Sequence, residues 1–168
     1  IETVGVGQSE TMVNSMVDFF MLLMLAGAGD ELQGIKRGIM EMADALIITK
    51  ADGDNLIKAR RAKKEYENAM HLFPPNENEW IPKTLVASAI EDYNMEKTFN
   101  TIDSFVNQTK TNGSFLNNRK QQDKYWLHET IADTLMSNFY SAERLVKVIV
   151  DVEQDVIEGR ISSFEGAE

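Results

Sequence analysis

Short apolar runs alternate with segments of helical periodicity along the first two thirds of the chain. Short, mainly apolar segments, each closed by glycine or polar residues, lie at 17–25, 45–48 and 83–87. Apolar residues recur with the spacing of an amphipathic helix at 30–43, 56–73 and 95–106. Short apolar runs that end in turn residues are typical of strands buried on both faces of a parallel sheet. The alternation therefore predicts an α/β fold built on a parallel sheet.

The chain changes character after Asn112-Gly113, a dipeptide typical of a break between elements. From residue 115 to residue 159 the pattern is helical, and Ser141 permits a bend or a new helix start. We therefore expect an α/β part over residues 1–111 and a helical part over residues 112–168. Residues 145–157 carry two adjacent apolar stripes, whereas a helix packed on its own domain needs one. The second stripe indicates either a contact with another subunit or a larger local core.

Composition and charge narrow the classes of function. The 168 residues carry a formal net charge of -10, which disfavours binding to nucleic acid or to an anionic membrane. The absence of cysteine excludes disulfides and thiolate zinc sites, and two histidines make a multi-histidine metal site a poor prediction. The strongest apolar run, Phe19–Ala28, lies between Asp18 and Asp30 and is shorter than the ~20 residues of a membrane-spanning helix. We expect a cytoplasmic protein, and we interpret the basic residues between Lys58 and Lys64 as a solvated helix face.

The first residues, Ile1 to Gly7, have the pattern of a strand end followed by a glycine-rich turn. Because a strand has about five residues, we expect that the chain is part of a longer polypeptide. Ligands of open parallel sheets bind at the carboxyl ends of the strands, so polar residues at these ends are candidates for function. Glu2 is suited to hold Mg²⁺ through water, and Gly5 would let a backbone N–H approach a phosphate. A solvated carboxylate and a turn glycine explain the same two residues.

Two further strand ends carry residues suited to a nucleotide base. A carboxylate at Asp52 can accept two N–H donors from one edge of guanine, and adenine lacks this donor pair. Lys50 can lay its aliphatic stem over a base. Ser88 and Ala89, at the end of the next predicted strand, can offer a backbone N–H to the base oxygen. Each of these pairs alone is also what an ordinary solvated turn contains.

Three segments closely resemble the MeaB/ArgK family of P-loop GTPases. They are Glu2–Glu10 (ETVGVGQSE), Asp18–Gly38 (DFFMLLMLAGAGDELQGIKRG) and Ile39–Asp52 (IMEMADALIITKAD). The resemblance implies part of a G-domain sheet, followed by an α-helical extension through which the protein forms a homodimer. It also implies binding of GTP or GDP with Mg²⁺, and hydrolysis of GTP. The family's partner is a cobalamin-dependent acyl-CoA mutase, such as methylmalonyl-CoA mutase, whose adenosylcobalamin the GTPase helps to load and protect.

The resemblance also assigns roles to individual positions. Glu2 would lie near magnesium and Gly5 near the γ-phosphate, and Gln8 is by position a candidate for orienting the attacking water. Thr49, Lys50 and Asp52 would stand in the guanine motif N-K-x-D, and Ser88-Ala89 in the S-A motif that follows it. The segment 27–38 resembles a further switch loop that senses the mutase, with these members: Asp30, Glu31, Gln33, Lys36 and Arg37. From the residues alone, that loop is equally a helix start whose acidic residues face the helix dipole.

Two departures from the family pattern affect these expectations. Thr49 stands where the family usually has asparagine, and its shorter side chain without an amide would weaken the hold on the base and the phosphate loop. The phosphate loop G-x-x-x-x-G-K-[ST] is absent from these 168 residues, so we expect the fragment alone to have no useful GTPase activity. Two alternatives stay open: an ATP-using kinase or ATPase linked to amino-acid transport (lysine, arginine, ornithine), and a non-catalytic dimerising module.

Overall fold

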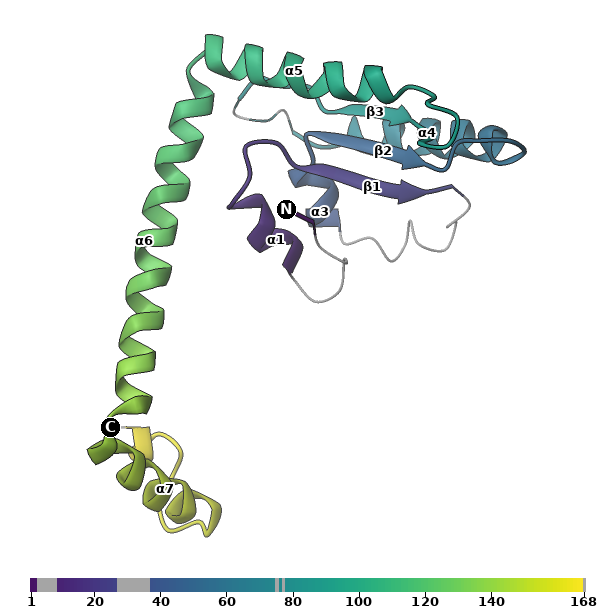
Figure 1. The fold of residues 1–168 in the computed structure, drawn as a ribbon. Helices are drawn as coiled ribbons and strands as arrows, with labels where there is room; N and C mark the ends of the chain where they lie inside the picture. Colours follow the sequence, from purple (N-terminus) through teal and green to yellow (C-terminus); the bar gives the residue numbers. More distant parts are fainter. Residues whose placement is uncertain (3–8, 27–36, 75, 77, 168) are drawn as a thin grey trace. The chain divides into compact units, whose positions relative to one another are not determined.

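The computed structural model describes residues 1–2, 9–26, 37–74, 76 and 78–167. The chain divides into two compact units, residues 1–122 and residues 123–168, and each is described by itself. The first unit holds a parallel sheet with helices, and the second is helical (Figure 1). The predicted α/β class is therefore confirmed. The predicted division at residue 112 stays a prediction, and the two units meet within the long helix α6 (Ser114–Ser141).

The sheet has three parallel strands in the order β1-β2-β3. They are β1 (Met21–Leu25), β2 (Ala45–Thr49) and β3 (Lys83–Val86). The central strand β2 is buried from Ala45 to Ile48, because it has a neighbour on each side and a helix layer on each face. The register pairs Ile48 of β2 with Met24 and with Val86, so the carboxyl ends of all three strands lie at one edge.

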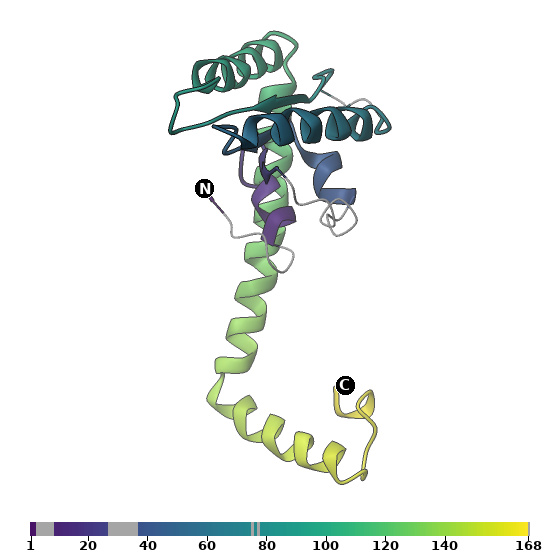
Figure 2. The same cartoon turned by 90° about the vertical axis from the view of Figure 1, so that its right-hand side faces the viewer.

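Two helices cover opposite faces of the sheet (Figure 2). Helix α4 (Asn55–Met70) packs Ala59 and Tyr66 against the face that carries Leu46, Ile48 and Val86. Helix α5 (Met95–Thr111) lies on the other side, where the Phe105 ring contacts Phe19 and Trp80 edge-on at centroid distances of 5.0 and 5.4 Å. These apolar layers hold the strand ends in place. Pro74 follows α4, as its lack of a backbone N–H favours.

The first strand differs from its prediction in two ways. Residues 17–20 are not part of β1, because Asp18 forms an ion pair with Arg119 and the Phe20 N–H donates to the Asp44 carboxylate at 2.8 Å. Nor is β1 buried on both faces, since Leu23 is 55% exposed. Among the described residues no strand pairs with its outer edge. The prediction of a doubly buried strand over 17–25 is thus wrong for this strand.

The first unit also contains two short helices, and its helix α5 is longer than the sequence predicts. Helices α1 (Ser9–Asn14) and α3 (Arg37–Met42) flank the first strand in sequence, and Met40 of α3 enters the core. Helix α5 runs to Thr111, five residues beyond the predicted end, because Thr109 is buried and its hydroxyl donates to the Phe105 carbonyl at 2.7 Å.

The helical part bends where the sequence predicts. Helix α6 ends at Ser141, Ala142 is extended (φ -69°, ψ 114°), and α7 (Glu143–Ile157) begins after it. A short 3₁₀ turn, η1 (Glu165–Ala167), lies against α7, where Gly166 approaches Val152 closely. None of the helices in the described segments is both long and apolar enough to cross a bilayer.

Candidate nucleotide-binding site

The carboxyl ends of β2 and β3 bring two predicted site residues into direct contact. The Ser88 hydroxyl donates a hydrogen bond of 2.7 Å to Oδ2 of Asp52, across a separation of 36 positions in the chain. Ser88 is fully buried, and its backbone N–H and C=O both bond to Tyr93, at 3.0 and 2.9 Å. The backbone of Ser88 is therefore held in place, and its hydroxyl orients the Asp52 carboxylate.

The turn after β2 holds Asp52 rigidly. Lys50 adopts a left-handed conformation (φ 54°), and its carbonyl accepts a hydrogen bond of 2.6 Å from the Asn55 side chain. Ala51 is fully buried, and its N–H donates to the Ala87 carbonyl at 3.1 Å. Gly53 follows with φ 47°, a conformation that costs glycine little. The Lys50 side chain is exposed at this edge.

A glutamate that the sequence analysis does not single out links the two loops. The Glu91 N–H donates to the Ser88 hydroxyl at 3.3 Å, and the Gly53 N–H donates to the Glu91 carboxylate at 3.2 Å. Each of the two loops thus donates a hydrogen bond to the other: Ser88 donates to Asp52, and Gly53 donates to Glu91. A glutamate in a polar turn carries no signal of this role in the sequence, because its partner lies 38 positions away.

Thr49 uses its hydroxyl within the sheet. The hydroxyl donates a hydrogen bond of 3.0 Å to the Met24 carbonyl, near the carboxyl end of β1. This bond ties the ends of β1 and β2 together. The hydroxyl of Thr49 is therefore engaged with the neighbouring strand β1. The weaker nucleotide binding expected from threonine at this position stays a prediction.

The chemistry of this edge is that of a carboxylate receptor for N–H donors. Ser88 donates to Oδ2 of Asp52, and no described residue donates to Oδ1. Each carboxylate oxygen accepts more than one hydrogen bond, so both oxygens keep capacity for a ligand. Ala89 is exposed beside this pair. The arrangement suits a planar ligand edge with two adjacent N–H donors.

The remaining predicted site residues are placed less completely. Glu2 is exposed near the start of the chain, and Arg37 is the first residue of α3. The others lie outside the described residues: Gly5, Gln8, Asp30, Glu31, Gln33 and Lys36. Within the described segments, no group of three histidine, aspartate or glutamate side chains is placed to hold a metal ion.

A parallel sheet whose carboxyl edge carries such a receptor has the architecture of a nucleotide-binding α/β protein. A crystal structure of an LAO/AO transport system kinase superposes on 99% of this chain and 53% of its own, with a TM-score of 0.75 and 34% identity. The fold is therefore that of part of a P-loop NTPase. The model of the family described as methylmalonyl Co-A mutase-associated GTPase MeaB matches residues 1–144. The chain belongs to this family, as the resemblance in the sequence implies.

Curated relatives agree with this assignment, and several of them are named as GTPases. A protein of Caulobacter vibrioides named as a GTPase is 39% identical over 168 residues, which cover 51% of its length. The methylmalonic aciduria type A homolog of Mus musculus is 39% identical, with 40% of its length covered. GTPase ArgK of Escherichia coli is 40% identical over 143 residues, 85% of this chain and 43% of that protein. The chain thus spans about half the length of these relatives, or less.

Proposed function

We propose that this chain supplies the base-binding edge and the helical arm of a GTPase that assists a cobalamin-dependent acyl-CoA mutase. The bond between Ser88 and Asp52 is the observation that carries the proposal. It presents a carboxylate, held on a rigid turn, at the edge of the sheet where ligands of such folds bind. Guanine offers two N–H donors to that carboxylate. Adenine would leave the carboxylate's acceptors unpaired, which is costly in a partly buried site.

Nucleotide competition in the complete protein tests this assignment. Unlabelled GDP and ADP compete for the site against a fluorescent GDP analogue, and we expect GDP to displace it at far lower concentration. Asp52→Asn should weaken GDP binding about 100-fold, since charge-assisted hydrogen bonds contribute ~1.5–3 kcal/mol each. The matched control is Asp54→Asn, because Asp54 is exposed and its side chain does not cap α4. Equal displacement by ADP would refute the guanine assignment.

The family resemblance leads us to expect that Glu2, Gly5 and Gln8 contribute to the magnesium and γ-phosphate side of the site. Glu2 is a carboxylate suited to water-mediated contact with Mg²⁺, and Gly5 and Gln8 would lie beside the γ-phosphate in the same loop. The described residues do not form a complete metal-ligand set. We therefore assign no catalytic step to this chain alone. The loop with Asp30 and Glu31 is proposed as the segment that senses the mutase.

The second candidate function is the transport-linked kinase or ATPase. The similarity of this chain to an LAO/AO transport system kinase, at 34% identity, favours this candidate. The same competition experiment separates the two functions, because a kinase that uses ATP requires adenine to bind. Preference for ATP over GTP would favour this second candidate over a guanine-specific enzyme.

We propose that the helical arm forms a homodimer. Helix α6 exposes Leu127, Ile131 and Leu135 at four-residue intervals, with exposed fractions of 58, 48 and 64%. These apolar side chains remain in contact with water unless another protein surface covers them. Leu135→Glu should shift the sedimentation coefficient to that of a monomer. Ser137→Glu, on the opposite side of the same helix, should leave the dimer intact. Dimers that persist in the Leu135 variant would remove the assignment.

A further inference from the structure

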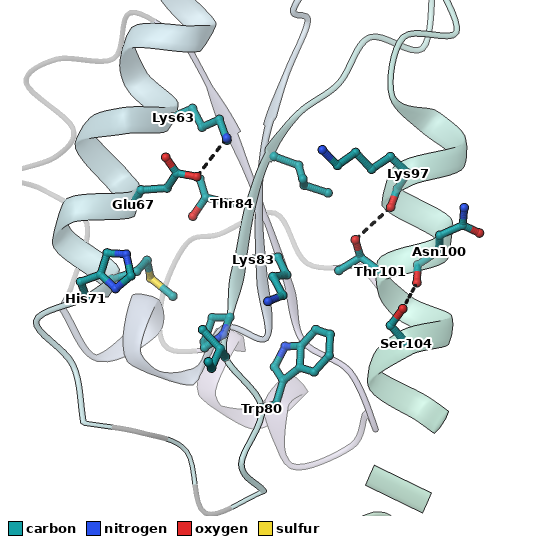
Figure 3. A pocket seen from close by; sticks show the side chains of 14 residues that line it. Lys63, Glu67, His71, Trp80, Lys83, Thr84, Lys97, Asn100, Thr101 and Ser104 are labelled. Atoms are coloured by element: carbon teal, nitrogen blue, oxygen red, sulfur yellow. Dashed lines mark hydrogen bonds and ion pairs between the residues drawn. The ribbon is translucent and has the colours of Figure 1, made fainter. Parts of the chain in front are cut away.

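A groove of about 530 Å³ lies along the outer edge of β3, away from the candidate nucleotide site. Helix α4 forms one wall, α5 forms the other, and β3 forms the floor (Figure 3). The groove begins beside Trp80 and extends past Lys83 and Thr84. These residues are at the amino end of β3, whereas Ser88 follows its carboxyl end. The groove is therefore independent of the proposed nucleotide function.

The floor of this groove is the outer edge of β3, where the backbone groups of Thr84 have no strand partner among the described residues. The N–H groups of Lys83 and Ala87 donate to carbonyls of the β2 side, Asp44 at 3.3 Å and Ile48 at 2.9 Å. Parallel pairing alternates along a strand, so the N–H and C=O of Thr84 point to the opposite edge. Among the described residues, no strand pairs with that edge at Thr84, whereas further along it the Val86 carbonyl accepts a hydrogen bond of 2.9 Å from the Asn94 side chain and Ser88 pairs with Tyr93. Thr84 is 6% exposed, and buried backbone groups normally have hydrogen-bond partners.

The walls of the groove carry positive charge in an otherwise acidic chain. Lys63 extends from α4 and Lys97 from α5, and their amines point toward the space over β3 from opposite sides (Figure 3). Lys63 is paired with Glu67 at 2.9 Å, and Lys83 lies 5.4 Å from the centre of the Trp80 ring. The α5 side of the groove therefore holds the less compensated charge. A local basic surface on a protein with a net charge of -10 favours an acidic partner.

We propose that this groove binds an acidic peptide segment in extended conformation, which adds to the sheet as a strand beside β3. The Thr84 N–H and C=O would bond to the peptide backbone, as in other cases of strand addition. Alternate side chains of an extended peptide point to opposite walls, so carboxylates on one side reach Lys83 and Lys97. A small anion satisfies the lysines but is repelled by the Thr84 carbonyl oxygen. A peptide backbone supplies the N–H that this carbonyl accepts.

Fluorescence anisotropy with a labelled peptide of alternating valine and glutamate tests the proposal on the complete protein. We expect saturable binding that weakens about tenfold or more with Lys97→Glu and with Lys83→Glu, because close charge pairs across an interface become repulsive. The matched control is Lys64→Glu, at an exposed position of α4 outside the groove. Circular dichroism confirms that each variant is folded. No binding to the unaltered chain, or equal loss with the control, would overturn the proposal.

Methylated peptides separate strand addition from simple charge attraction without altering the protein. In an extended strand, alternate N–H groups face the same edge. N-methylation of the valine residues and of the glutamate residues, in two separate peptides, therefore blocks different edges. We expect one peptide to lose binding about tenfold or more and the other to keep it. Equal binding by both, together with full displacement by tripolyphosphate, would show an anion site and refute the peptide proposal.

Discussion

Asp44 couples the stability of the sheet to pH. It lies directly before β2, is 8% exposed, and accepts a hydrogen bond of 2.8 Å from the Phe20 N–H. Burial disfavours the charged form and raises the pKa of the Asp44 carboxyl from 3.8 to about 6, although the bond from Phe20 acts in the opposite direction. The folded protein therefore binds a proton at Asp44 more tightly than the unfolded chain does.

The sign of the effect follows from this difference in proton binding. The stabilisation is fully present below the unfolded pKa of 3.8 and is lost as the pH rises through about 6. The difference between the two pKa values corresponds to about 3 kcal/mol, since one pH unit corresponds to ~1.4 kcal/mol. At pH 8 the folded protein holds a buried carboxylate with only partial compensation.

Urea unfolding of Asp44→Asn between pH 4.5 and pH 8 measures this effect directly. The amide has nearly the shape of the carboxyl, can accept the bond from Phe20, and does not titrate. We expect the free energy of unfolding of the variant, relative to the unaltered chain, to rise by about 2 kcal/mol across this range. Asp54→Asn serves as the control, because Asp54 is exposed. A difference that is constant with pH would refute the reasoning.

Three further perturbations follow from the contacts of the first unit. Thr49→Val removes the bond to the Met24 carbonyl and should lower the free energy of unfolding by about 1 kcal/mol in urea titrations. Arg119→Met removes the partner whose hydrogen bonds hold the pKa of Asp18 below its usual value. Its cost, about 0.5–1 kcal/mol for a partly exposed pair, should be present near pH 7 and vanish as the pH falls through that lowered pKa. Phe105→Ala should cost about 3–4 kcal/mol by thermal or urea unfolding, and a loss below 1 kcal/mol would contradict the packing described.

Local periodicity was sufficient for most of the architecture. The predicted strands at 45–48 and 83–87 correspond to β2 and β3, and the helical pattern at 56–73 corresponds to α4. The break near Asn112 and the bend at Ser141 were equally visible, because glycine and serine positions interrupt a periodic pattern. The exposed face of β1 could not be predicted from the sequence, since an apolar run has the same composition whether or not another layer covers it.

The sequence by itself determined the fold class and the residue types at each strand end, because both depend on neighbours within a few positions. Only the tertiary structure decided that Ser88 donates to Asp52, that Glu91 links the two loops, and that Thr49 bonds to the first strand. The groove beside β3 was also beyond the sequence, where Lys63 belongs to a basic run interpreted as a solvated face. The physical reason is the parallel register, which places residues more than twenty positions apart at one edge of the sheet. Sequence periodicity does not indicate which of these distant residues come into contact.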